Sequence, residues 1–196
     1  MDSSPKFPNP QGKGLSPVLE SLRQAKTQLS VPAKNIDRIS NELFTSLFIL
    51  NSQIRFKPVS GQGYWLYRKN GRYNLSLIAP EQWSTHQYGR YIGRCELQAD
   101  LTWTLRLSGQ CLNDPALIDE IKRRRERFEN SMQRAERIDD LLPVYIETLP
   151  FYSRALASAL AHSLKQSMQK GGISGLNFNQ ARRILTQQHE ENPTEK

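Results

Sequence analysis

The stretch Gly63–Trp83, GYWLYRKNGRYNLSLIAPEQW, decides the fold of this 196-residue chain. Two apolar, aromatic-rich runs flank Asn70-Gly71. This dipeptide is the strongest short-range signal for a β-hairpin, because a type I′ turn needs positive φ at both central residues. The turn also fixes the pairing of the two strands, and it places Leu66 opposite Leu75.

The two faces of this hairpin are expected to differ, because side chains alternate between the faces of a strand. One face is apolar and is expected to belong to the core: Tyr64, Leu66, Tyr73, Leu75 and Leu77. The other face is expected to be a more exposed, aromatic surface: Trp65, Tyr67, Asn74 and Ser76.

Two further strands are predicted after the hairpin 63–79. Residues 88–97 are rich in aromatic side chains, and their two glycines allow a bulge or a close backbone approach. Apolar residues alternate with polar ones in 101–107, so one face of that strand should be buried. Its polar residues are Thr102, Thr104 and Arg106. The sequence therefore predicts an α+β fold with a small four-stranded antiparallel sheet, packed with amphipathic helices before and after it.

Helical spacing of apolar residues predicts helices on both sides of the sheet. Residues 16–55 are interpreted as a pair of helices, the second with the clearest apolar stripe of the chain. This stripe consists of Ile36, Ile39, Leu43, Leu47, Leu50 and Ile54. Within 115–186, Asp114-Pro115 opens a long helix, and Tyr152 begins the stripe of another. Asn177 caps a last one, and Pro80 begins a single turn inside the sheet region.

A single α+β domain is predicted over residues 15–186, with the helix pair at 16–55, the sheet at 63–108 and the C-terminal helices at 115–186. Residues 1–14 and 187–196 are polar and are predicted to be disordered tails. No run approaches the roughly 18 apolar residues of a membrane span, and the N-terminus has no apolar leader segment. We therefore expect a cytoplasmic protein without a membrane span.

The net charge of +8 raises the odds of an anionic partner, although many soluble proteins are basic without one. Rings and cations interleave on the predicted sheet, as in proteins that hold single-stranded nucleic acid. The alternative is that the tryptophans fill space between sheet and helices. An arginine run on the long helix could bind phosphates, or it could be a solvated face with interspersed glutamates. The candidate binding residues are Trp65, Tyr67, Arg68, Arg72, Arg90, Arg94, Arg123, Arg124 and Arg125.

No motif indicates catalysis, a cofactor or a metal site. The histidines do not lie at metal-ligand spacing from Cys95 or Cys111: His86, His162 and His189. Three carboxylates near the sheet could perform acid–base chemistry if they were buried together: Glu81, Glu96 and Asp100. We expect instead that Glu81 stabilises a helical turn and that Glu96 pairs with an arginine. We therefore expect no catalytic residues, no metal and no cofactor.

A seven-residue spacing marks the long helix, because Ile121, Phe128, Ala135 and Leu142 fall at this interval. The heptad is imperfect, since Arg125 occupies another seam position. A dimer through helix 115–142 is one alternative. The favoured one is that the helix packs against the sheet or helices of its own chain.

Residues 64–104 combine an aromatic hairpin, a Pro-acidic-x-Trp turn and a strand that runs from leucine to tryptophan. This combination resembles a family of small proteins classed as a domain of unknown function. The matching residues are Tyr64, Leu66, Tyr67, Gly71, Ser76, Ile78, Pro80, Trp83, Gly93, Leu97, Asp100 and Trp103. The resemblance supports the fold boundary, brings no catalytic residues with it and leaves the function open.

Three functions follow in order of preference. The first is a non-enzymatic cytosolic module whose sheet surface and long basic helix bind another macromolecule, most simply a protein partner. The second is RNA or single-stranded DNA binding through the same surface. The third is an enzyme of unfamiliar type.

Overall fold

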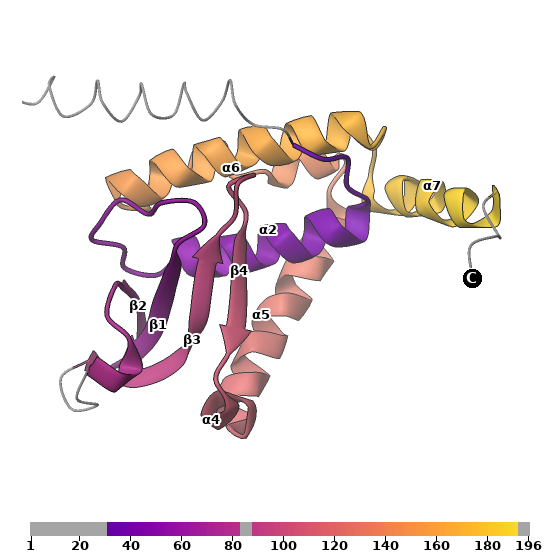
Figure 1. Ribbon diagram of the computed structural model, residues 1–196. Coiled ribbons are helices and arrows are strands. Elements are labelled where there is room, and N and C mark those ends of the chain that lie inside the picture. The colour runs from indigo at the N-terminus through magenta and orange to yellow at the C-terminus, as the bar shows by residue number, and fades with distance from the viewer. Residues whose placement is uncertain (1–30, 83–87, 192–196) are drawn as a thin grey trace, which may run out of the picture. The chain divides into compact units, whose positions relative to one another are not determined.

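A four-stranded antiparallel sheet is the centre of the computed structural model (Figure 1). Its strands are β1 (Gly63–Lys69), β2 (Arg72–Ser76), β3 (Arg90–Leu97) and β4 (Trp103–Leu107), and their order is β2-β1-β3-β4. Helices come before and after the sheet in the chain. The α+β prediction and the antiparallel sheet are therefore confirmed.

The structure describes residues 31–82 and 88–191. These residues belong to one unit of the chain, Val31–Lys196. The predicted tail 1–14 and the first predicted helix, within 16–30, lie outside the described residues.

The hairpin has the predicted register, with Leu66 opposite Leu75. Asn70 and Gly71 both have positive φ, 51° and 75°, as a type I′ turn requires. Gln53 extends the sheet beyond β2 through a parallel bridge to Asn74. The edge of β2 is therefore partly covered by the chain that follows the preceding helix.

The pairing of β1 with β3 contains a β-bulge: Gly93 lies opposite Leu66, whereas Tyr91 lies opposite Tyr67. One extra residue of β3 is accommodated between these pairs. Gly93 also allows a close backbone approach: a Cβ atom added there would lie 2.3 Å from the backbone oxygen of Arg106. The predicted close backbone approach is therefore confirmed at Gly93.

Two boundaries of the sheet differ from the prediction. Leu77 lies beyond the end of β2 and is 50% exposed, so it is not a core residue. Strand β4 begins at Trp103, because Leu101 has a φ of 65° and forms a turn. Thr102 is buried and not exposed, and its hydroxyl is satisfied by a hydrogen bond that it donates to Asp100. Alternation could not predict these positions because the backbone leaves the strand conformation there.

The helix before the sheet, α2, spans Ile36–Leu50. Asn35 caps it, as its side-chain oxygen accepts a hydrogen bond from the Arg38 N–H. Ile54, the last residue of the predicted stripe, lies after the helix but is buried. Pro80–Gln82 forms the predicted single turn, here the 3₁₀-helix η1.

The helices after the sheet are α4 (Gly109–Leu112), α5 (Pro115–Arg134), α6 (Phe151–Lys170) and α7 (Phe178–Glu191), with the 3₁₀-helix η2 (Ile138–Leu141) between α5 and α6. Asp114 caps α5 and Asn177 forms a reciprocal cap with Gln180, as predicted. In the described residues, no helix is long and apolar enough to cross a membrane.

Three helix predictions need correction. Helix α5 ends at Arg134, so the continuous helix 115–142 and its full heptad do not form. Helix α7 continues to Glu191, into the predicted tail 187–196. Tyr152 is 41% exposed, whereas Leu160 and Leu164, which follow it in the predicted stripe, are fully buried.

One face of the sheet packs into the core. Tyr64, Leu66, Cys95 and Trp103 lie on it and are almost fully buried. Figure 1 shows the sheet in front of α2, whose residues Ile39 and Leu43 are also fully buried. Phe128 of α5 packs on Phe44 of α2, with ring centroids 5.6 Å apart, so α5 packs within its own chain.

Candidate functional site

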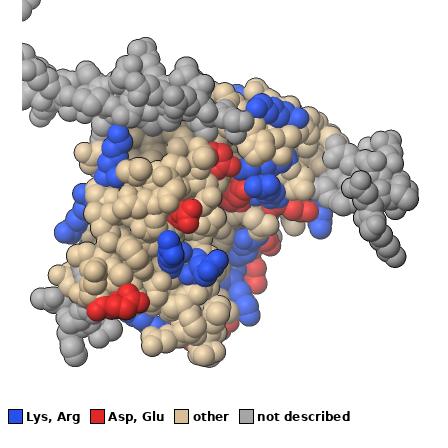
Figure 2. All heavy atoms as spheres, viewed as in Figure 1, with Lys and Arg blue, Asp and Glu red and all other residues tan. Residues whose placement is uncertain are grey.

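The face of the sheet opposite the core, here called the open face, is the candidate functional site. Strand alternation and register place the following residues on it: Trp65, Tyr67, Lys69, Arg72, Asn74, Ser76, Tyr91, Arg94, Glu96, Thr104 and Arg106. All except Tyr67 are half-buried or exposed. Figure 2 shows this face, with basic side chains gathered near its centre.

A row of side chains crosses all four strands of the open face. The register places Ser76, Trp65, Arg94 and Arg106 side by side, and this set is called the Arg94 row. Neighbouring strands lie about 4.8 Å apart, so these side chains are close neighbours. Both arginines are exposed, and within the described residues neither forms an ion pair. The row therefore combines an aromatic ring with two available cations.

Arg94 owes its position to a glycine. A Cβ atom at Gly63 would lie 2.7 Å from Nε of Arg94 and 2.8 Å from its Nη2. The guanidinium therefore lies close to Gly63 of β1, in space that the Cβ atom of any other residue would occupy. This contact holds the Arg94 charge close to the sheet surface.

A second row crosses the sheet beside the first. Gln53, Asn74, Tyr67 and Tyr91 are successive neighbours, here called the Tyr67 row. The centroids of the two tyrosine rings are 5.7 Å apart. Tyr67 is only 3% exposed, and its hydroxyl donates a 2.9 Å hydrogen bond to the backbone oxygen of Ile78. It is therefore less accessible than the sequence suggested.

The electrostatics of the Tyr67 row keep its phenols neutral. Burial, with a smaller contribution from Tyr91, raises the pKa of Tyr67 to about 12. Burial also raises the pKa of Tyr91 above its usual value. Both hydroxyls therefore remain protonated near neutral pH, and the positive charge of the open face is not offset by phenolate.

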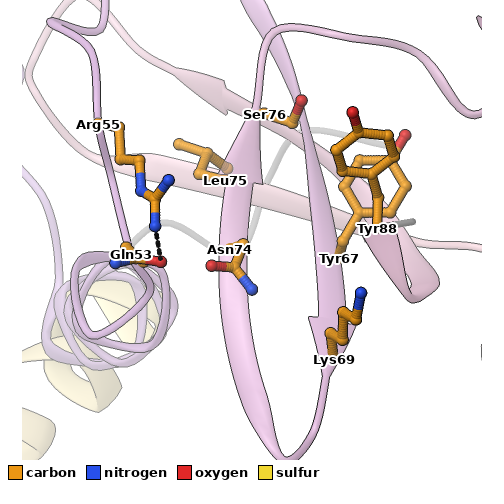
Figure 3. A pocket seen from close by; sticks show the side chains of 8 residues that line it. All are labelled: Gln53, Arg55, Tyr67, Lys69, Asn74, Leu75, Ser76 and Tyr88. Atoms are coloured by element: carbon orange, nitrogen blue, oxygen red, sulfur yellow. Dashed lines mark hydrogen bonds between the residues drawn. The ribbon is translucent and has the colours of Figure 1, made fainter. Parts of the chain in front are cut away.

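A cavity of about 260 Å³ lies on the open face at the β2 edge (Figure 3). It is lined by Gln53, Arg55, Tyr67, Lys69, Asn74, Leu75, Ser76 and Tyr88. Arg55 donates a 3.2 Å hydrogen bond to the side-chain oxygen of Gln53. In the described residues, the Asn74 carboxamide forms no hydrogen bond. The cavity thus joins aromatic, amide and cationic groups.

Two of the predicted binding arginines lie elsewhere, between the hairpin and α5. Arg68 and Arg124 each place a guanidinium nitrogen 2.7 Å from a carboxylate oxygen of Glu120. Both guanidiniums also lie 5.5 Å from the centre of the Tyr73 ring, at cation–π distance. These arginines join β1, β2 and α5 on the core side of the sheet.

Two further predicted arginines also have partners within the chain. Arg90 pairs with Asp114, the residue that caps α5. Arg125 forms a 2.8 Å ion pair with Glu129, and its guanidinium lies 4.9 Å from the centre of the Phe44 ring. Any external ligand would therefore compete with existing contacts at both positions.

The nine predicted residues are thus not brought together in one site. Trp65, Tyr67 and Arg94 lie on the open face, with Arg72 at its hairpin end. Arg123 is exposed on α5. The other four arginines hold elements of the fold together. The structure adds Arg106 and the residues that line the cavity with Tyr67, none of which was predicted from the sequence.

The three carboxylates near the sheet occupy different settings. Asp100 forms an ion pair with the buried Lys34, which also forms an ion pair with Glu42. Burial raises the pKa of Asp100, but hydrogen bonds from Lys34 and Thr102 outweigh it, so the pKa lies below its usual value. Glu81 lies in η1, and Glu96, on the open face, forms no ion pair with a described arginine. The expected Glu96 pairing is not observed.

In the described part of the chain, no group of three His, Cys, Asp or Glu side chains could hold a metal ion. His162 lies in α6, with its Nε2 atom 3.1 Å from Nε2 of Gln166. His86 and the side chain of His189 lie outside the described residues.

Fold and site together define a small α+β domain with an open aromatic and basic sheet face. The sequence model of a family described as "Protein of unknown function (DUF2452)" matches residues 22–110. This match confirms the resemblance to an uncharacterised domain family, and it covers α2 and all four strands. No curated protein and no solved structure matches the chain.

Proposed function

We propose that this chain is a non-enzymatic interaction module that binds single-stranded nucleic acid on the open face of its sheet. The observation that carries the proposal is the Arg94 row. Exposed Arg94 lies next to the half-buried Trp65, and exposed Arg106 lies on the other side of Arg94; neither arginine has an ion-pair partner in the described residues. Single strands are held by this combination of flanking cations and aromatic rings.

The distribution of the arginines favours the sheet over the long helix. Arg124 and Arg125 of α5 are engaged with Glu120 and Glu129. Phosphates bound there would have to displace carboxylates that already neutralise the guanidiniums. On the open face, a phosphate meets unpaired charge and releases its own counterions, which favours binding at low salt.

The composition of the open face also favours nucleic acid over a protein partner. Protein interfaces have an apolar, aromatic centre from which charged residues are depleted. Here the central strands β1 and β3 place Arg94 next to Trp65, and β4 adds Arg106. Charge at the centre of the surface suits a polyanion better than an apolar protein surface.

A cytosolic location is part of the proposal, with support from the two cysteines. Cys95 and Cys111 are both buried and free. Burial raises the pKa of Cys95 to about 12, so this thiol is unreactive near neutral pH. Unpaired buried thiols are typical of proteins from reducing compartments.

The test is fluorescence anisotropy with labelled single-stranded RNA and DNA of mixed sequence, measured over a range of salt concentrations. The double variant Arg94→Gln/Arg106→Gln should weaken binding and reduce the slope of log Kd against log salt by about 1.4, for two lost phosphate contacts. Arg123→Gln/Arg127→Gln removes the same charge from exposed positions of α5 and is the matched control. It should leave the slope unchanged.

Absence of binding at low salt and high protein concentration would refute the proposed function. Equal effects of the two double variants would also contradict it, because they would indicate attraction by net charge alone. A loss confined to the α5 variant would move the site to the helix. Circular dichroism and thermal melting of each variant must first show that its fold is retained.

A further inference from the structure

The cavity at the β2 edge of the open face has the composition of a site for one base. We propose that it binds an adenine base of the single-stranded nucleic acid, with Asn74 reading the base edge. This inference rests on the proposed function and deepens it, since it assigns base preference to a defined part of the surface.

The size of the cavity limits its occupant. Pockets for drug-sized ligands occupy roughly 300–1,000 Å³, and this cavity measures about 260 Å³. It therefore has room for one small planar group, with the remainder of a larger ligand outside. Its position next to the Arg94 row, through the shared residue Ser76, would let a strand continue across the open face.

The cavity supplies hydrogen-bonding groups at its centre. Figure 3 shows the Asn74 carboxamide between Gln53 and Tyr67. Asn74 is half-buried, and its amide forms no hydrogen bond within the described part of the chain. A carboxamide offers a donor and an acceptor together, which matches the N6 and N7 pair of adenine. The ligand would therefore satisfy an amide that the fold leaves open.

An aromatic wall and a cation complete the site. Tyr88 lines the cavity and is 37% exposed, so its ring offers a surface for a base. Unstacked bases of single strands are commonly held on tyrosine rings. Arg55 is exposed and uses one of its five N–H donors on Gln53, which leaves others for the phosphate of the same nucleotide.

The experiment compares labelled oligoadenylate, oligouridylate and oligocytidylate of equal length by fluorescence anisotropy. The wild type should bind oligoadenylate at least about fivefold more tightly than the other two, the lower limit for one bidentate contact. Asn74→Leu, similar in shape but without the amide, should reduce the affinity for oligoadenylate to that of the others. Asn74→Thr serves the same purpose if the leucine variant does not fold.

Two further variants separate base reading from charge. Gln169→Leu replaces an exposed carboxamide on α6 and should retain the preference for adenine. Arg55→Gln should weaken the binding of all three oligonucleotides by a similar factor. A preference for adenine that survives both Asn74 variants would overturn the inference.

The outcomes distinguish this inference from the proposed function. Equal, salt-sensitive binding of all three oligonucleotides overturns the adenine site while the proposed function stands. Absence of binding to all of them refutes both. Tight binding that does not respond to salt would indicate an apolar contact, and it would likewise contradict both.

Discussion

The two faces of the sheet are built from the same strands, yet they differ in how their polar groups are satisfied. On the core face, Arg68 is held by a carboxylate and an aromatic ring. On the open face, Arg94 and Arg106 have no ion pair with a described residue. Charged groups near a core need partners, whereas those on an open surface can remain available for a ligand. The difference separates arginines that contact other elements of the fold from those that we propose for ligand binding.

The tryptophans test this contrast most strongly. Trp103 lies on the core face, is 2% exposed and has its ring centroid 5.8 Å from that of Tyr64. Trp103→Ala should cost about 3–5 kcal/mol of unfolding free energy. Trp65 lies half-buried on the open face, and Trp65→Ala should cost only about 1 kcal/mol. Urea unfolding followed by circular dichroism measures both. Similar costs would mean that the open face is covered in solution.

Replacement of the buried Lys34 should give the next largest change in the unfolding free energy. Lys34→Met leaves Asp100 and Glu42 without their shared cation and should cost about 3 kcal/mol near neutral pH. Asp100 has a lowered pKa in the wild type, so its ion pair stabilises the fold above about pH 4 and less as the pH falls below this. In the variant, the Thr102 hydrogen bonds remain, but the loss of Lys34 should raise this pKa. The difference between the two proteins should therefore shrink below about pH 4.

Urea titrations at several pH values measure that difference. Arg38→Met is the matched control, because Arg38 is mostly exposed and contacts only the Glu42 side of the network. Its cost should stay below about 1 kcal/mol. A penalty for Lys34→Met that did not change with pH would show that its cause is packing and not the loss of the ion pair.

The hairpin shows how far local sequence can predict structure. Asn70-Gly71 set the turn, the turn set the register, and alternation then assigned the two faces correctly from Tyr64 to Ser76. These inferences worked because each depends on neighbouring residues. The caps at Asp114 and Asn177 were predictable for the same reason. Prediction from alternation fails at Leu77 and Leu101, where the backbone is no longer in the strand conformation.

The candidate site was less predictable, because it depends on which charges find partners across the fold. Nothing local separates Arg68 from Arg94, since Glu120 is distant from both in sequence. Lys34 lies in a segment without a recognisable pattern, yet it meets Asp100 in the folded chain. The cavity could have been suspected only from Asn74, which alternation had already placed beside Tyr67. Gln53 enters it through a strand bridge that no sequence pattern indicated.

The smallest change in stability is expected for a substitution at Gly63. This substitution would test the open face most selectively. The three atoms nearest to a Cβ atom at Gly63 all belong to the Arg94 guanidinium, whose flexible side chain can move away. Gly63→Ala should therefore change the unfolding free energy by no more than about 0.5 kcal/mol. Gly93→Ala is the matched control: its Cβ atom meets the backbone of Arg106, which cannot move independently, so it should cost about 1–3 kcal/mol.

Gly63→Ala should nevertheless weaken binding of single-stranded nucleic acid, because it lifts Arg94 away from the position it holds beside Trp65. The loss should be smaller than that of Arg94→Gln, since the charge remains on the same face. Urea unfolding and fluorescence anisotropy of the same preparations give both quantities. A variant with unchanged stability and unchanged affinity would show that the seating of Arg94 against β1 does not matter for the ligand. The Arg94 row would then act through its charge alone, without the fixed geometry that the glycine provides.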